Sequence, residues 1–146
     1  MDWQALPDEN SYRFVAVLNK KIETRRLMNA LGHMTAGLAG KVGAGSNLCF
    51  LDYVDQDGGG HPGISHFPFI ILAADNSNKV RTVRNEAIAR NLPFTDFVSS
   101  MTLGTSQNQV ETTAATKEAD LEYFGIVMFG ETKVLKEFTN KFSLFK

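Results

Sequence analysis

Short apolar runs rich in β-forming residues alternate along the chain with segments whose apolar residues recur at helical spacing. The first run, residues 12–18, is largely apolar, which is typical of a strand buried on both faces. The next segment begins at Thr24, a suitable N-cap residue, and contains no proline. Its apolar stripe consists of Leu27, Leu31, Met34 and Leu38. The pattern therefore predicts a buried strand followed by a helix that ends in the glycine-rich run 40–45.

The rest of the chain continues this alternation. Strands are predicted at residues 48–53, 64–67, 69–73, 94–98 and 123–129. The glycine-rich segment 55–60 is expected to join the first two of these as a hairpin, because glycine adopts positive φ without strain. Two further helices are predicted to bury Val80, Val83 and Ala87, and then Val134, Leu135, Phe138 and Phe142. The polar segment 102–116 is interpreted as a long loop with at most one helical turn, and loops of this length are often functional.

The order of these elements predicts an α/β fold class, a three-layer α/β/α sandwich with a mixed sheet. The 146 residues suffice for one domain with a real core, so residues 1–146 are interpreted as a single domain. A hydrophobic content of 43% and a formal net charge of −1 exclude a disordered tail and a basic nucleic-acid arm. The basic cluster at residues 20–26 still leaves a local contact with RNA open.

Cysteine usage and the lack of targeting signals indicate the compartment. Cys49 is the single cysteine, so an internal disulfide is excluded. No apolar stretch reaches the ~20 residues that a membrane span needs, and the first residues do not form a basic and then apolar signal region. We therefore expect a cytoplasmic protein with no membrane partner.

Three segments resemble a bacterial family known as "domain of unknown function two thousand". They are residues 57–72 (DGGGHPGISHFPFIIL), residues 94–101 (FTDFVSSM) with the polar loop after them, and residues 122–130 (EYFGIVMFG). That family is similar in fold to class II peptidyl-tRNA hydrolase, the archaeal and eukaryotic type. The resemblance implies a class II peptidyl-tRNA hydrolase-like sandwich, a hydrolase-like activity and a homodimer.

The motifs of the hydrolase are only partly matched. Residues 29–33 (NALGH) resemble the hydrolase helix with its Gln-x-x-His, and residues 123–146 resemble its final strand, glycine turn and helix. The Gly-Lys-Gly-Lys loop of the hydrolase corresponds to Glu-Thr-Arg-Arg at 23–26. Its Asp-Ala-Gly-Arg-Thr-Gln motif corresponds to residues 101–107 (MTLGTSQ), which contain no acidic or basic residue. The resemblance thus supports the fold more strongly than the same reaction.

Polar residues on the first predicted helix form the candidate site. Asn29 and His33 lie four residues apart and share one face of the helix, near the carboxyl end of the first strand, where open α/β sheets usually bind ligands. His33 is the candidate catalytic acid–base, or a hydrogen-bond donor to a ligand, with Asn29 beside it; the alternative is a structural histidine bonded to a nearby loop. Arg25 and Arg26 are candidates for binding a phosphate or carboxylate, or else form a solvated first turn.

Three residues outside this helix complete the ligand-binding candidates. Asp96 lies within the predicted strand 94–98, before the polar segment, and could accept a hydrogen bond from His33, although an ordinary strand-edge aspartate is the favoured interpretation. Thr102 and Thr105 lie in the polar segment and could line the mouth of a pocket. These residues place the candidate site between the first helix and the segment after the strand at 94–98.

Other reactive side chains give weaker candidates. His61 and His66 lie near Asp52, Asp55 and Asp57, but their spacing matches no common metal motif, so turn-forming roles in a hairpin are favoured and no metal is expected. Cys49 lies beside Phe50 and Leu51 and is interpreted as an inert thiol. No cofactor is expected.

Two functions remain open from the sequence. In the first, a hydrolase-like enzyme, His33 and Asn29 polarise an ester carbonyl or position water, Arg26 holds a phosphate, and residues 102–107 cover the site. Because these loop residues include no acid, the sequence does not settle which group acts as general base. In the second, the same fold is a non-catalytic module that binds a small molecule or a protein partner. The expected partners are a small-molecule or tRNA-like ligand and a second copy. The small residues of the first helix, Gly32, Ala36, Gly37, Ala39 and Gly40, favour close packing against the sheet or that copy.

Overall fold

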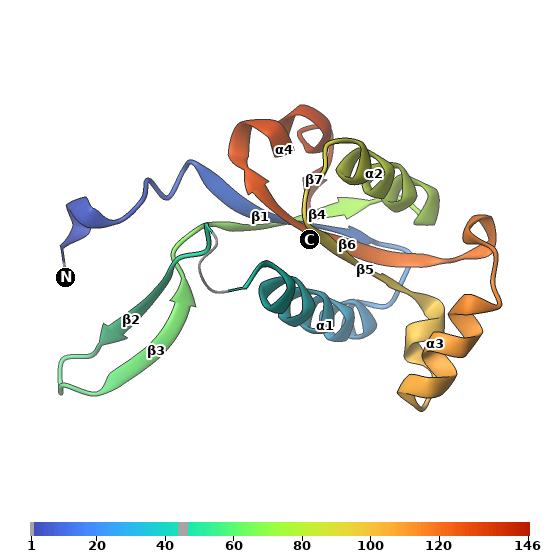
Figure 1. Ribbon diagram of the computed structural model, residues 1–146, viewed down its shortest axis with the longest axis horizontal. Coiled ribbons are helices and arrows are strands. Elements are labelled where there is room, and N and C mark those ends of the chain that lie inside the picture. The colour runs from blue at the N-terminus through green and yellow to red at the C-terminus, as the bar shows by residue number, and fades with distance from the viewer. Residues whose placement is uncertain (1, 44–46) are drawn as a thin grey trace.

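A mixed five-stranded sheet forms the centre of the molecule (Figure 1). The computed structural model describes residues 2–43 and 47–146. The strands, in sheet order, are β5 (Phe94–Val98), β6 (Tyr123–Glu131), β1 (Tyr12–Asn19), β4 (Phe69–Ala74) and β7 (Ser143–Leu144). Strand β1 pairs in parallel with β4 and antiparallel with β6, whereas β5 and β7 run antiparallel to their neighbours. The sheet is therefore mixed, as the sequence predicts.

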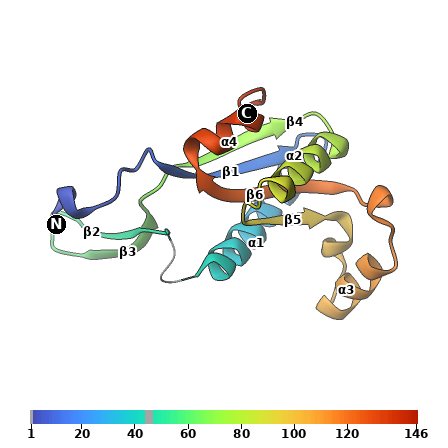
Figure 2. The same ribbon diagram turned by 45° about the horizontal axis from the view of Figure 1, so that its top comes forward.

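Helices cover both faces of this sheet (Figures 1 and 2). Helix α1 (Thr24–Val42) packs on the face to which Phe14, Ala16 and Leu18 of β1 point. Helices α2 (Ser77–Ala89) and α4 (Thr132–Thr139) pack on the opposite face, against Val15 and Val17. Residues 14–19 of β1 are buried on both sides, which explains the unbroken apolar run in the sequence.

The remaining elements extend from this core. Strands β2 (Phe50–Val54) and β3 (Gly60–Ser65) form the predicted hairpin, which projects beyond the sheet (Figure 1). Three short 3₁₀ turns lie at Trp3–Ala5, Ser99–Thr102 and Glu118–Asp120. None of the helices in the described ranges combines the length and the apolar character needed to cross a membrane.

The structure corrects three local predictions. The segment 102–116 contains a nine-residue helix, α3 (Ser106–Ala114). None of its residues is buried, so its sequence has no apolar stripe that would predict a helix. Thr24 does not cap α1: Glu23 is the N-cap, and no side chain makes a capping hydrogen bond. Strand β6 continues through Gly130 to Glu131, so the chain turns one residue later than predicted.

Two further boundaries differ from the prediction: strand β3 spans Gly60–Ser65 instead of 64–67, and helix α4 ends at Thr139, so Phe142 follows the helix and is half-buried. Helix α1 ends at Val42, followed by Gly43 at φ 75°, while the last residues of the predicted glycine stop lie outside the described ranges. Strand β7 was not expected, since two residues carry no periodicity.

The carboxyl ends of the three parallel strands β1, β4 and β5 lie at one edge of the sheet, and β6 begins there. Asn19 closes β1 at this edge: its amide donates to the carbonyl oxygen of Tyr123 at 3.0 Å and accepts from the backbone N–H of Lys21 at 3.0 Å. This buried asparagine thus has a structural role. The edge is also where α1 begins and where α3 lies (Figure 1).

Candidate functional site

A cleft of about 450 Å³ lies between the first half of α1 and the segment that follows β5. Helix α1 contributes four polar side chains to it, from Arg25, Arg26, Asn29 and His33. The opposite wall consists of Phe97, Met101, Thr102, Leu103 and Gln109. A neighbouring cavity of about 250 Å³ shares His33 with this cleft and adds Asp96. The cleft of about 450 Å³ falls in the range of roughly 300–1,000 Å³ that is usual for small-molecule sites.

Two aromatic rings, Phe97 in the cleft wall and the buried Phe124 behind it, pack against two of the polar side chains of the cleft. The guanidinium carbon of Arg26 lies 5.0 Å from the ring centroid of Phe124, which is fully buried. The Phe124 and Phe97 centroids are 5.5 Å apart, and those of Phe97 and His33 are 6.1 Å apart. A cation over an aromatic face is attracted by the ring quadrupole. Packing therefore positions Arg26 and His33 without using their hydrogen-bond donors.

The α1 side chains retain their hydrogen-bonding capacity. Within the described ranges, no hydrogen bond or ion pair involves the side chain of Arg26, Asn29 or His33. Arg25 approaches the Glu23 carboxylate at 3.4 Å but remains 84% exposed at its side chain. Helix α1 has no acidic residue in its first turn and no side-chain cap, so its N-terminal N–H groups add partial positive charge. The cleft can accordingly accept a ligand with negative charge and hydrogen-bond acceptors.

Asp96 does not make the hydrogen bond with His33 that the sequence left open beside the favoured interpretation of an ordinary strand-edge aspartate. Its carboxylate instead accepts from Nε of Arg84 at 2.7 Å, and both side chains are 27% exposed. Asp96 also borders the smaller cavity beside His33, so it stays near the site with its charge already paired. The imidazole therefore has no carboxylate to orient it among the residues that the structure describes.

The two predicted threonines have different positions. Thr102 lines the cleft, and its hydroxyl donates to the carbonyl oxygen of Ser99 at 2.7 Å. Thr105 caps α3 instead, its Oγ1 accepting from the backbone N–H of Asn108 at 3.1 Å. Thr105 does not line the cleft but caps α3, the helix that contributes Gln109 to the cleft wall.

Gln109 is a cleft residue that the sequence analysis did not identify. It lies on α3, where its Nε2 donates to the carbonyl oxygen of Leu103 at 2.7 Å. A signal was present in the sequence: after Thr105, an N-cap residue type, the chain continues for 19 residues, 106–124, without glycine or proline. A helix predicted on that basis would have placed Gln109 one turn after Thr105, toward the preceding segment.

The hairpin side chains have partners within the fold. Nε2 of His61 lies 2.9 Å from the Asp55 carboxylate, and Nε2 of His66 lies 2.8 Å from the carbonyl oxygen of Pro7. Asp52 accepts from the backbone N–H of Gly63 at 2.7 Å. In the described part of the chain, no three such side chains gather where they could hold a metal ion. Cys49 is a free, half-buried thiol.

A polar network behind the cleft holds the segment that follows α3. The phenol of Tyr123 donates to Glu118 at 2.8 Å, and Nε of Arg81 pairs with the same carboxylate at 2.8 Å. Arg81 also donates to the carbonyl oxygen of Leu121 at 2.7 Å. Burial and the Glu118 hydrogen bond raise the pKa of Tyr123 to about 12, while the hydrogen bonds from Arg81 and Tyr123 lower the pKa of Glu118. The network therefore fixes the end of the α3 segment against α2.

Comparisons with known proteins extend over almost the whole chain. Residues 12–146 match the family described as "Protein of unknown function (DUF2000)". A similar solved structure is that of the protein of unknown function Atu0240 from Agrobacterium tumefaciens strain C58, at a TM-score of 0.76 and 14% identity, covering 93% of this chain and 98% of that one. At this identity the likeness shows a shared fold. No curated protein matches the chain.

Proposed function

The chain belongs to the DUF2000 family of proteins of unknown function, and we propose that it is a hydrolase acting on an ester bond close to a phosphate group. The observation that carries this proposal is the set of Arg26, Asn29 and His33. These side chains line one cleft, and within the described ranges they have no hydrogen-bond partner in the protein. The resemblance to the fold of class II peptidyl-tRNA hydrolase, stated from the sequence, supports an acyl ester of a tRNA-like ligand as substrate.

Each side chain has a chemical role in this proposal. Arg26, with Arg25 at the rim, pairs with the phosphate, because guanidinium groups bond phosphate oxygens in a bidentate manner. The Asn29 amide donates to the ester carbonyl oxygen and supports the charge that develops on it. The His33 imidazole takes a proton from water as the water oxygen attacks the carbonyl carbon, and returns that proton to the leaving alcohol when the ester C–O bond breaks.

A non-catalytic module that binds the same class of ligand is the second candidate. One observation favours it: among the described residues no carboxylate pairs with the His33 imidazole, since Asp96 points toward α2 and is paired with Arg84. General-base histidines are usually held by such a partner. The two candidates share the binding residues and differ only in turnover.

The test is hydrolysis of an N-acylated aminoacyl ester of a short tRNA acceptor mimic by the purified protein. We expect turnover by the wild type, a loss of about 100-fold in kcat for His33→Ala, and mainly a raised KM for Arg26→Ala. The matched control is His61→Ala, because that imidazole lies on the projecting hairpin (Figure 1).

The outcomes separate the candidates. Binding of the mimic without hydrolysis would favour the binding module. Hydrolysis that His33→Ala and His61→Ala leave equally unchanged would remove the role assigned to His33. If the protein neither binds nor hydrolyses the mimic, the proposed substrate class is wrong.

A further inference from the structure

The carboxyl ends of β1 and β4 form a second place in the fold that is suited to a ligand. These strands are parallel neighbours, but β1 continues into α1 on one face of the sheet and β4 continues into α2 on the other (Figures 1 and 2). When the chain segments that follow two neighbouring parallel strands go to opposite faces of the sheet, a crevice forms outside the carboxyl ends of those strands. Open α/β sheets usually bind ligands in this crevice. This crevice lies apart from the α1–α3 cleft, which is next to β5.

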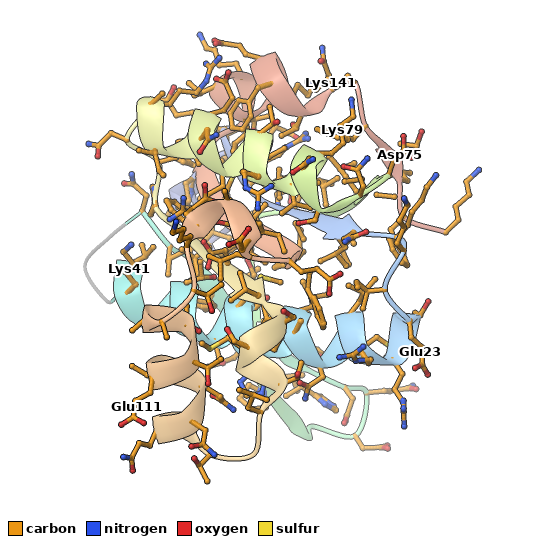
Figure 3. All side chains as sticks on the ribbon, turned by 90° about the vertical axis from the view of Figure 1, so that its right-hand side faces the viewer. Glu23, Lys41, Asp75, Lys79, Glu111 and Lys141 are labelled. Carbon is orange, nitrogen blue, oxygen red and sulfur yellow. The ribbon has the colours of Figure 1, made fainter. Side chains whose placement is uncertain are left out.

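A cavity of about 220 Å³ occupies this crevice. Three lysines from different segments line it: Lys20 follows β1, Lys79 lies in the first turn of α2, and Lys141 lies between α4 and β7. Phe142 adds an apolar wall. Figure 3 shows Lys79 and Lys141 close together and near Asp75, well separated from Glu23 at the start of α1. The fold thus gathers positive charge here in a chain whose formal net charge is −1.

The positive charge in the cavity exceeds the negative charge. Asp75 is the one carboxylate among the described lining residues, and it pairs with Nζ of Lys20 at 2.9 Å. The hydrogen bond from Lys20, with further attraction from Lys79 and Lys21, keeps the pKa of Asp75 below its ordinary value. In the described ranges the ammonium groups of Lys79 and Lys141 have no salt-bridge partner. Two lysine charges therefore remain for a ligand.

The start of α2 adds to this potential. Asn76 caps the helix, its side chain accepting from the backbone N–H of Lys79 at 2.9 Å, so the N-terminal turn is held in place beside the lysines. N–H groups at a helix N-terminus carry partial positive charge and suit phosphate oxygens. The volume is below that of sites enclosing whole drug-sized ligands, so it suits a phosphate group with a small attachment.

We infer that this lysine cavity, defined by Lys20, Lys79 and Lys141, binds the phosphate group of a small phosphorylated ligand. The inference does not depend on the proposed hydrolase activity, because none of these lysines lines the α1–α3 cleft. Asp75 limits the affinity, since its carboxylate repels the phosphate and holds Lys20.

Calorimetric titration at low ionic strength tests this inference, with inorganic phosphate and ribose 5-phosphate as probes. We expect Lys79→Ala and Lys141→Ala each to weaken binding about three- to tenfold, and the double variant to lose it. Asp75→Asn is expected to tighten binding, because it removes the opposing charge. The matched control is Lys117→Ala, an exposed lysine outside the cavity. The circular dichroism and Tm of each variant verify that it is folded.

Three results would overturn the inference. Wild-type protein that binds neither probe at 10 mM has no such site. Equal weakening by Lys117→Ala and Lys79→Ala would show only diffuse attraction between charges. Loss of phosphate binding in Arg26→Ala, with Lys79→Ala unchanged, would assign the phosphate to the α1–α3 cleft. Binding that survives Arg26→Ala supports the lysine cavity even if the ester-hydrolase proposal fails.

Discussion

The alternation of side chains along β5 decides which residues reach the cleft. Thr95 points toward α1 and donates to the carbonyl oxygen of Met34 at 2.7 Å, and Phe97 packs on the same side against Phe124. Asp96, between them, points toward α2 and pairs with Arg84. Successive residues of a strand face opposite sides of the sheet. The carboxylate next to Phe97 in sequence is therefore on the wrong face to orient His33.

Tyr123 gives a prediction for stability at high pH. The pKa of its phenol is raised to about 12 in the folded protein by burial and by the hydrogen bond to Glu118, whereas a tyrosine in the unfolded chain ionises near pH 10. Because folding favours the protonated phenol, this contribution to stability is complete below pH 10 and is lost as the pH rises to 12. Tyr123→Phe should reduce the fall in the free energy of unfolding between pH 10 and 12 by roughly 1–3 kcal/mol, as measured by urea denaturation. Identical falls in both proteins would contradict this prediction.

At the level of single residues, the sequence predicted those parts of the site that depend on local periodicity. Asn29 and His33 share a face because they are four apart on one helix, and the structure places both in the cleft with Arg26. The partner of Asp96 could not be predicted in this way, because Arg84 comes from α2 and the pairing depends on how α2 lies over β5.

At the level of elements, α3 is the part of the candidate site that the pattern of apolar residues failed to predict. It buries no residue and is held by its Thr105 cap and by side-chain hydrogen bonds, among them one between Ser100 and Thr113. The helices α1, α2 and α4 and the strands β1, β4, β5 and β6, which the sequence predicted, all bury apolar residues in one of the two core clusters, whereas the predicted hairpin strands β2 and β3 bury none. Apolar periodicity reports burial, so it identified the core elements and not the polar wall of the cleft.

The small residues of α1 give a second prediction at this scale. A Cβ added at Gly32 would meet nothing within 4 Å, so packing against the sheet does not explain this glycine. Gly32→Ala should stabilise the helix by up to ~1 kcal/mol and raise Tm by a few degrees in calorimetry. The matched change Gly125→Ala should lower Tm, because its Cβ would lie 3.1 Å from the carbonyl oxygen of Val17 and 2.7 Å from Leu18 Cδ2.

A fall in Tm for Gly32→Ala would contradict the prediction that a Cβ at this position meets open space. It would indicate that a second molecule covers this part of α1. Gly32 lies in an apolar surface groove with Met28 and Leu31 of α1 and Phe69 and Ile71 of β4. A homodimer is still a prediction from the sequence, and this groove is where small residues on α1 would allow a second copy to approach.

At the scale of the whole molecule, the carboxyl edge of the sheet carries both of the ligand sites that we propose. The α1–α3 cleft lies beside β5 and includes the start of α1, whereas the lysine cavity lies outside β1 and β4. The hairpin β2–β3 projects from the opposite end (Figure 1). The strand order, which puts three parallel carboxyl ends on one side, concentrates the basic residues of 20–26 there despite the near-neutral net charge.

Binding in the α1–α3 cleft can be located directly by a ¹H–¹⁵N NMR titration with a non-hydrolysable amide analogue of the acylated acceptor mimic. We expect the largest chemical-shift changes at residues 25–33 and 97–109, and their loss in Arg26→Ala. Shifts confined to the hairpin or to the lysine cavity, or none at millimolar ligand, would contradict the assignment of this cleft as the functional site.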